Sequence, residues 1–224
     1  IRDFCLSRGL GDVYKRQTIG LPKSLTAACG VDALTHCIEA YTVQLHQPIT
    51  DALALKGISM IAENLEKAYE NGEDREARRN MMIASTIGGM AFISSNVGAV
   101  HAFAETVGAW FDTPHGVANS LFLPYIMEFN IPACPERFAD IADAMGIERE
   151  ESMSDEQYAL KAVEYVKALN RKLNIPTIKE IKGITEERFE AIAERSANNV
   201  LSNDNARKIT KEDYLELLKK AYNE

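Results

Sequence analysis

The residues best suited to chemistry in this chain are its histidines and one nearby aspartate. Three of the four histidines, His36, His101 and His115, lie in strongly apolar segments. Asp32 precedes His36 by four residues, so on a helix their side chains project from one face about one turn apart. A carboxylate and an imidazole placed in this way are suited to binding a divalent metal ion. An Asp-x-x-x-His pair also arises by chance, so the pair alone does not define a site.

The distance between the other two histidines depends on a break in the chain. His101 and His115 are fourteen residues apart, which on one unbroken helix places them roughly 21 Å from each other. Residues 112–114 (Asp-Thr-Pro) end a helix, because proline lacks the backbone N–H and clashes with the preceding turn. The next helix can therefore turn back and bring both imidazoles to one centre. Core histidines that are hydrogen-bonded to backbone carbonyls are the alternative, and we interpret the fourth histidine, His46, as a loop or surface residue.

Hydrophobic residues recur every three or four positions along most of the chain, a pattern that predicts helices. Thr50 and Asp51 predict one helix start, and we expect Thr113 to cap and Pro114 to begin another. No segment has the alternating pattern of a strand. The sequence therefore predicts an all-α, multi-helical, bundle-like domain. Its predicted helices span residues 25–43, 52–70, 73–93, 97–111, 115–129, 136–145, 155–173, 186–197 and 211–222.

Composition excludes several classes of protein. The 224 residues carry a formal net charge of −8 and no run of five Lys or Arg, so nucleic acid is not an expected partner. The four cysteines contain no Cys-x-x-Cys pair and are too few for a secreted disulfide framework, which favours a cytoplasmic location. Residues 80–104 carry no formal charge but include seven polar side chains. We therefore expect a buried helix with a break near 94–96 rather than a membrane span.

The first seventeen residues differ from the rest of the chain. They lack helical or strand periodicity and are locally basic, with Arg2, Arg8, Lys15 and Arg16. The string resembles translated adapter or assembly-junction sequence, so we interpret residues 1–17 as non-native and exclude them from the fold. A native, disordered arm is the alternative. The expected organisation is a junction segment, 1–17, followed by one helical metal-binding catalytic domain, 18–224.

Two longer motifs resemble those of a known family. Residues 21–41 (LPKSLTAACGVDALTHCIEAY) are similar to the first motif of the iron-containing (group III) alcohol dehydrogenases. Residues 98–104 (GAVHAFA) and 112–119 (DTPHGVAN) are similar to the second. The resemblance, which runs from about Ile19 to the carboxyl end, implies the helical C-terminal domain of the dehydroquinate synthase-like fold. The N-terminal nucleotide-binding α/β domain of that family would be missing, and the chain would be a truncated gene product.

The resemblance also implies a metal centre and a reaction. The positions of the family's four metal ligands are held by Asp32, His36, His101 and His115. Iron(II) is the implied ion, and zinc or manganese would accept the same donors. The ion would act as a Lewis acid while a hydride passes between a primary alcohol or diol, or its aldehyde, and NAD or NADP. The nucleotide-binding residues would lie mostly in the missing domain, so the fragment alone would be inactive, and the full-length form would be a homo-oligomer.

One position departs from the family pattern. Glu105 stands four residues after His101, where many relatives have a further histidine that is thought to help proton transfer. On a helix the two residues share a face, so Glu105 is a candidate catalytic residue: an acceptor that orients the imidazole, a proton relay, or a carboxylate solvated at the rim of the cleft.

Two alternatives to a dehydrogenase stay open. One is a stand-alone metal-dependent hydrolase with Glu105 or Glu39 as its base, and the other is a non-catalytic helical metal-binding module.

Overall fold

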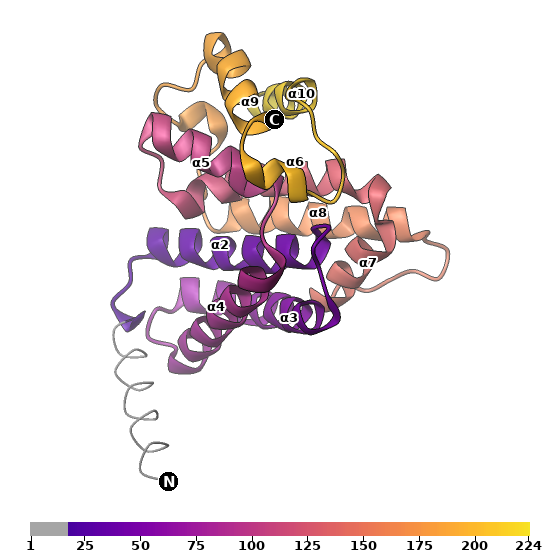
Figure 1. The fold of residues 1–224 in the computed structure, drawn as a ribbon. Coiled ribbons are helices and arrows are strands. Elements are labelled where there is room, and N and C mark those ends of the chain that lie inside the picture. The colour runs from indigo at the N-terminus through magenta and orange to yellow at the C-terminus, as the bar shows by residue number, and fades with distance from the viewer. Residues whose placement is uncertain (1–17) are drawn as a thin grey trace.

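The computed structural model describes residues 18–224, which form helices and no strand (Figure 1). The predicted junction segment 1–17 lies outside the described residues. The all-α prediction is confirmed. The α-helices are α2 (Lys23–Thr42), α3 (Pro48–Glu70), α4 (Arg75–Ser95), α5 (Ala99–Phe111), α6 (His115–Asn130), α7 (Pro135–Ala144), α8 (Asp155–Lys172), α9 (Phe189–Ala197) and α10 (Lys211–Asn223). The short 3₁₀ helices are η1 (Ile131–Ala133), η2 (Ile178–Glu180), η3 (Glu186–Arg188) and η4 (Val200–Asp204).

The predicted start of one helix is wrong by a full turn. Helix α3 begins at Pro48, with Gln47 as its N-cap, and not after Thr50 and Asp51. The backbone N–H of Gln47 donates to Thr50 Oγ1 at 3.1 Å, and this hydroxyl donates to the Gln47 carbonyl at 2.8 Å. Proline is well suited to the first helical position, because the N–H that it lacks has no partner there.

The start of α6 also differs from the prediction. His115 is the first helical residue, and Pro114 precedes the helix with an extended backbone of φ −54° and ψ 133°. Thr113 does not cap α6, since its buried hydroxyl has no hydrogen-bond partner among residues 18–224. The chain changes direction at Asp112, whose φ of 51° is left-handed. The turn between α5 and α6 is therefore made by the backbone one residue before the predicted cap.

A sharp bend separates α4 from α5. Asn96, with a φ of 75°, follows the last residue of α4, and the two helices are bent by 106° at this break. The Asn96 amide donates to Asp204 at 2.5 Å, which ties the bend to η4. The break predicted near residues 94–96 is confirmed. Within residues 18–224 no single helix is long and apolar enough to cross a membrane, and α4 with α5 passes that test only as this bent pair, by length and composition.

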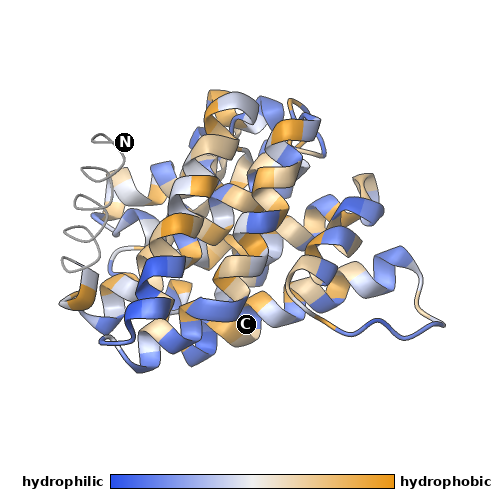
Figure 2. Cartoon of the chain, turned by 90° about the horizontal axis from the view of Figure 1, so that it is seen from below, coloured by the Kyte–Doolittle hydropathy of each residue, from blue (hydrophilic) through white to orange (hydrophobic). Residues whose placement is uncertain are grey.

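Helix α2 lies at the centre of the domain. It packs against α3 and α4 on one side and against α6 on the other (Figure 1). Fourteen of its 20 residues are buried, so it is shielded from solvent on nearly all sides. The outer helices instead alternate hydrophobic and hydrophilic residues (Figure 2), as amphipathic helices do when one face meets the core.

A group of three aromatic rings holds α5 and α6 together. Phe103 of α5 stacks on Phe122 of α6, with ring centroids 3.8 Å apart and planes 2° from parallel. Tyr214 of α10 packs its edge against Phe103 at 4.8 Å. All three side chains are fully buried. This packing fixes the relation between the two helices that carry His101 and His115.

Helix α6 begins in direct contact with the backbone of α2. A Cβ atom at Gly116 would lie 2.3 Å from the carbonyl oxygen of Ala28 and 2.7 Å from its carbonyl carbon. No side chain larger than hydrogen fits between these two backbones without movement. The glycine therefore brings the first turn of α6, and with it His115, close to α2.

We predict that Gly116→Ala lowers the free energy of unfolding by about 1–3 kcal/mol, because the added methyl group pushes α6 away from α2. Gly89→Ala is the matched control. Gly89 lies inside α4, where a Cβ meets no atom within 4 Å, so alanine there is expected to stabilise the protein by about 0.5–1 kcal/mol. Urea unfolding followed by circular dichroism measures both effects. Effects of the same sign would contradict the close contact at Gly116.

Candidate metal centre

Three helices bring the predicted ligands together. Helix α2 carries Asp32 and His36, α5 carries His101 in its first turn, and α6 begins at His115. One ligand atom from each of Asp32, His101 and His115 lies within 4.8 Å of the other two. His115 Nε2 is 3.7 Å from Asp32 Oδ1. The turn between α5 and α6 thus brings together two histidines that a straight helix would keep far apart.

His36 lies at the edge of this group. Its Nε2 atom is 3.1 Å from His101 Nε2, and its Nδ1 atom is 3.8 Å from Asp32 Oδ2. The His36 ring stacks on Phe92 of α4, with centroids 4.5 Å apart and planes inclined by 20°. The His101 ring centroid is 4.6 Å from that of His36 and 5.3 Å from that of His115. The imidazole of His101 therefore stands between the other two.

The donor set fits a divalent transition-metal ion. Two imidazole nitrogens bound to one tetrahedral ion at about 2.1 Å are about 3.4 Å from each other. The Nε2 atoms of His36 and His101 are separated by 3.1 Å, which is close to that value. Three imidazoles and one carboxylate suit iron(II), zinc and manganese alike. The residues present are therefore able to hold the kind of ion that the sequence motifs imply.

Asn119 is a site residue that we did not predict. Its Nδ2 atom donates to Asp32 Oδ1 at 2.6 Å and lies 3.2 Å from His101 Nε2 and 3.1 Å from His115 Nε2. Asn119 is fully buried, and its Oδ1 atom has no hydrogen-bond partner within residues 18–224. The available signal was its position four residues after His115, on the same face of α6. The amide keeps the Asp32 carboxylate directed toward the imidazoles.

Glu39 makes a second contact that the sequence did not predict, since the sequence indicates it only as a candidate base of a hydrolase. It is 3% exposed, and its Oε2 atom accepts a hydrogen bond from His101 Nδ1 at 2.5 Å. A carboxylate can only accept, so Nδ1 is the donor, and in the neutral imidazole Nε2 then carries the lone pair that faces the candidate centre. Glu39 therefore orients this imidazole, which was one of the three roles predicted for Glu105.

The electrostatic surroundings of two neighbouring imidazoles differ. Burial lowers the pKa of His36, the nearby His101 lowers it further, and the carboxylates of Asp32 and Glu39 only partly oppose this. Burial also acts against protonation of His101, but the hydrogen bond and negative charge of Glu39, with Asp32, outweigh it and raise the pKa of His101. The lowered pKa keeps His36 neutral near pH 7, the form in which imidazole binds a metal ion.

The candidate centre is open on one side. His101 is only 4% exposed, whereas the His115 side chain is 48% exposed and that of Asp32 is 23% exposed. A small molecule can therefore approach the donor atoms from the side of His115, while His101 forms the buried wall.

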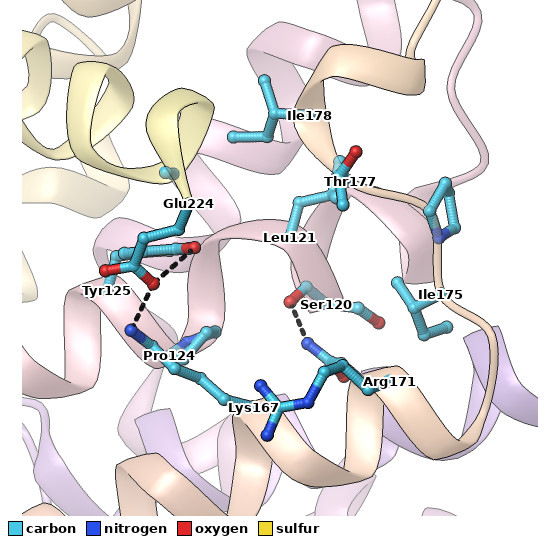
Figure 3. Close-up of a pocket in the computed structure, with 13 residues that line it drawn as sticks. Ser120, Leu121, Pro124, Tyr125, Lys167, Arg171, Ile175, Thr177, Ile178 and Glu224 are labelled. Carbon is cyan, nitrogen blue, oxygen red and sulfur yellow. Dashed lines mark hydrogen bonds and ion pairs between the residues drawn. The ribbon is translucent and has the colours of Figure 1, made fainter.

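A separate cavity of about 170 Å³ is lined by residues of α6 and α8 and by the segment after α8 (Figure 3). Asn170 of α8 donates to the Ser120 carbonyl at 2.7 Å, and Lys167 pairs with Glu224 at 2.5 Å. None of the four predicted metal ligands lines this cavity. It is therefore distinct from the candidate metal centre.

Glu105 lies on the surface, one turn of α5 beyond His101. Its Oε2 atom accepts a hydrogen bond from Asn199 Nδ2 at 2.6 Å. This arrangement agrees with a solvated carboxylate, and a role as proton relay stays a prediction.

His46 lies in the exposed loop between α2 and α3, as predicted, and its Nδ1 atom is 3.2 Å from Asp51 Oδ2.

The fold and the donor set together define a helical domain in which α2, α5 and α6 bring three imidazoles and one carboxylate into one neighbourhood. Residues 26–222 match the sequence profile described as the C-terminal part of the Fe-containing alcohol dehydrogenase family. The chain therefore belongs to the iron-containing alcohol dehydrogenase family, as its motifs predicted.

Individual relatives support the same assignment. The chain is 43% identical over 206 residues to alcohol dehydrogenase 4 of Saccharomyces cerevisiae and 40% identical over 204 residues to 1,3-propanediol dehydrogenase of Klebsiella pneumoniae. Each match covers 91% of this chain and 52% of the relative. The structure of an alcohol dehydrogenase from Oenococcus oeni matches with a TM-score of 0.87 at 40% identity, over 91% of this chain and 53% of that one. The chain thus spans about half the length of the curated relatives it matches.

We predict that the chain binds one Zn²⁺ or Co²⁺ ion and that His101→Ala weakens this binding by more than about 100-fold. Loss of a direct ligand should cost more than loss of a hydrogen-bonding partner, which typically costs 10- to 100-fold. Isothermal titration calorimetry measures the affinity. His46→Ala, which removes an exposed imidazole away from the site, is the control. Equal affinity of His101→Ala and the unmodified chain would exclude His101 as a ligand.

Proposed function

We propose that this chain is the metal-binding portion of an NAD(P)-dependent dehydrogenase that interconverts a small primary alcohol or diol and its aldehyde. The observation that carries this proposal is the convergence of three imidazoles and one carboxylate on an open side of the domain. The names of the relatives, an alcohol dehydrogenase and a propanediol dehydrogenase, support the substrate class. Iron(II), or zinc or manganese with the same donors, would be held by Asp32, His36, His101 and His115.

The protein residues have separate parts in this reaction. When bound, the ion would act as a Lewis acid that polarises the oxygen of the alcohol or aldehyde. The Asp32 carboxylate contributes one negative charge and the neutral imidazoles contribute none, so these residues would leave a divalent ion with a net positive charge for the substrate oxygen. His115, the most exposed of the four, lies where the substrate enters, and Asn119 keeps the Asp32 carboxylate facing the centre.

The nucleotide is bound mainly outside these 224 residues in this proposal, since the chain spans about half the length of its relatives. The chain alone would then hold the metal ion without transferring a hydride. The complete protein is proposed to be a cytoplasmic homo-oligomer. The thiols of Cys29, Cys37 and Cys134 are free, which agrees with a reducing compartment.

We predict that the complete protein reduces NAD⁺ or NADP⁺ with a small primary alcohol or a 1,3-diol. His115→Ala is expected to lower kcat/KM by about 100-fold or more, since Lewis-acid stabilisation is worth several kcal/mol and each 1.36 kcal/mol is a factor of ten. The absorbance of the reduced nicotinamide measures the reaction, with His46→Ala as the control. Metal-dependent hydrolysis of an ester or phosphate without nicotinamide reduction would instead indicate a hydrolase. Metal binding with neither activity in the complete protein would indicate a non-catalytic module.

A second prediction concerns Glu105. If its carboxylate relays a proton, Glu105→Gln in the complete enzyme removes one ionisation from the pH profile of kcat/KM, because an amide cannot exchange a proton in this range. Steady-state rates across the pH range measure the profile. Glu63→Gln, an exposed change on α3, is the matched control for the lost charge. A profile that Glu105→Gln leaves unchanged would rule out the relay.

A further inference from the structure

Both carboxylate oxygens of Glu39 are engaged by the first turn of α5. Oε1 accepts a hydrogen bond from the backbone N–H of Val100 at 2.8 Å, and Oε2 accepts one from His101 Nδ1 at 2.5 Å. Glu39 itself lies on α2 and is 3% exposed. One buried side chain of α2 therefore binds the main chain and the side chain of α5 at adjacent residues.

The start of α5 depends on this contact, because the helix has no cap of its own. The first N–H groups of a helix have no partners within the helix, and the N-cap residue here is Gly98, which has no side chain to supply one. Glu39 provides the acceptor for Val100, and Asn205 Oδ1 accepts from the N–H of Ala99 at 3.4 Å. A carboxylate at this end is also favoured by the helix dipole.

Gly98 leaves room for both acceptors. A Cβ atom at this position would lie 3.1 Å from Glu39 Oε1 and 3.1 Å from Asn205 Oδ1. Asn205 is held in turn by a pair of hydrogen bonds with the buried amide of Asn130, at 3.0 and 2.8 Å. The start of α5 is thus held both by Glu39 of α2 and by Asn205, which follows η4.

We propose that Glu39 is a positioning residue for metal binding: it fixes the ring orientation and the tautomer of His101 so that Nε2 presents a lone pair to the ion. The inference rests on the proposed metal site. His101 Nδ1 is occupied as a donor to Glu39, and Nε2 faces Asn119, His36 and the Asp32 carboxylate. Partners of this kind orient metal-bound imidazoles and raise their basicity.

A neutral amide cannot replace the carboxylate, because two donors meet it and an amide has only one acceptor oxygen. If the NH₂ group of the amide faces His101, Nδ1 must accept, and the proton moves to Nε2, where it blocks the metal. If the NH₂ group faces Val100 instead, it opposes the backbone N–H of Val100. The side chain must then shift, and the imidazole that is hydrogen-bonded to it is displaced. The first arrangement removes the tautomer of His101 that binds an ion, and the second moves the ring out of its orientation.

The test is a Co²⁺ titration of the 224-residue chain and its variants, followed by the visible absorption of the bound ion and by competition with a chelator. Glu39→Gln is expected to weaken Co²⁺ binding by about 10- to 100-fold and to change the absorption spectrum of the bound ion. Glu63→Gln removes the same charge from the exposed face of α3 and should bind Co²⁺ as the unmodified chain does. The thermal midpoint of each metal-free variant is measured in parallel, because a purely structural role would lower this midpoint without changing the affinity of the folded protein.

Glu39→Asp is a second test of the inference if Glu39→Gln does not fold, as judged by loss of its helical circular dichroism. It keeps the negative charge but is one methylene shorter, so it cannot reach both Val100 and His101, and an affinity loss of at least about tenfold is expected. Co²⁺ affinity within threefold of the unmodified chain, in whichever Glu39 variant folds, would overturn the inference while leaving the metal site intact. No Co²⁺ binding by the unmodified chain would overturn the proposed function itself.

Discussion

The burial of α2 is the constraint on which the rest of the structure depends. This helix is packed on both sides, yet it carries Asp32, His36 and Glu39. A polar group removed from water costs free energy unless it is paired. Each of these side chains therefore needs a partner on another element: Asn119 of α6 meets Asp32, His101 of α5 meets His36, and the backbone at the start of α5 meets Glu39. The contacts that pair the polar side chains of α2 also gather the donor atoms of the candidate metal centre.

The helices were predictable from the sequence because their apolar residues recur with a clear helical period. The start of α3 was not, since glutamine is not among the favoured N-cap residues, and the contact of Gln47 with Thr50 depends on the backbone that Pro48 sets. The turn before α6 was misplaced by one residue because the left-handed conformation falls on Asp112 rather than on a glycine. Periodicity thus gives the elements, and backbone geometry decides their ends.

The candidate site was predictable in part. The family motifs pointed to four ligands, and the structure brings these residues into one neighbourhood. Their partners were harder to find, because they depend on contacts between distant segments. Nothing near Glu39 in the sequence shows that it meets α5, since that contact requires the bend at Asn96. Asn119 gave a local signal, its spacing from His115, but buried asparagines at helical spacing have many roles.

The contacts that build the centre also have a consequence for folding kinetics. Glu39 and His101 are 62 positions apart, Asp32 and Asn119 are 87 apart, and Asn130 and Asn205 are 75 apart. Long-range contacts of this kind form only after large loops have closed, and closure carries an entropic cost. Individual helices need no such closure. A collapsed chain with full helix content but unclosed loops therefore lacks the candidate centre, so binding of a metal ion there would report the finished tertiary structure rather than the amount of helix.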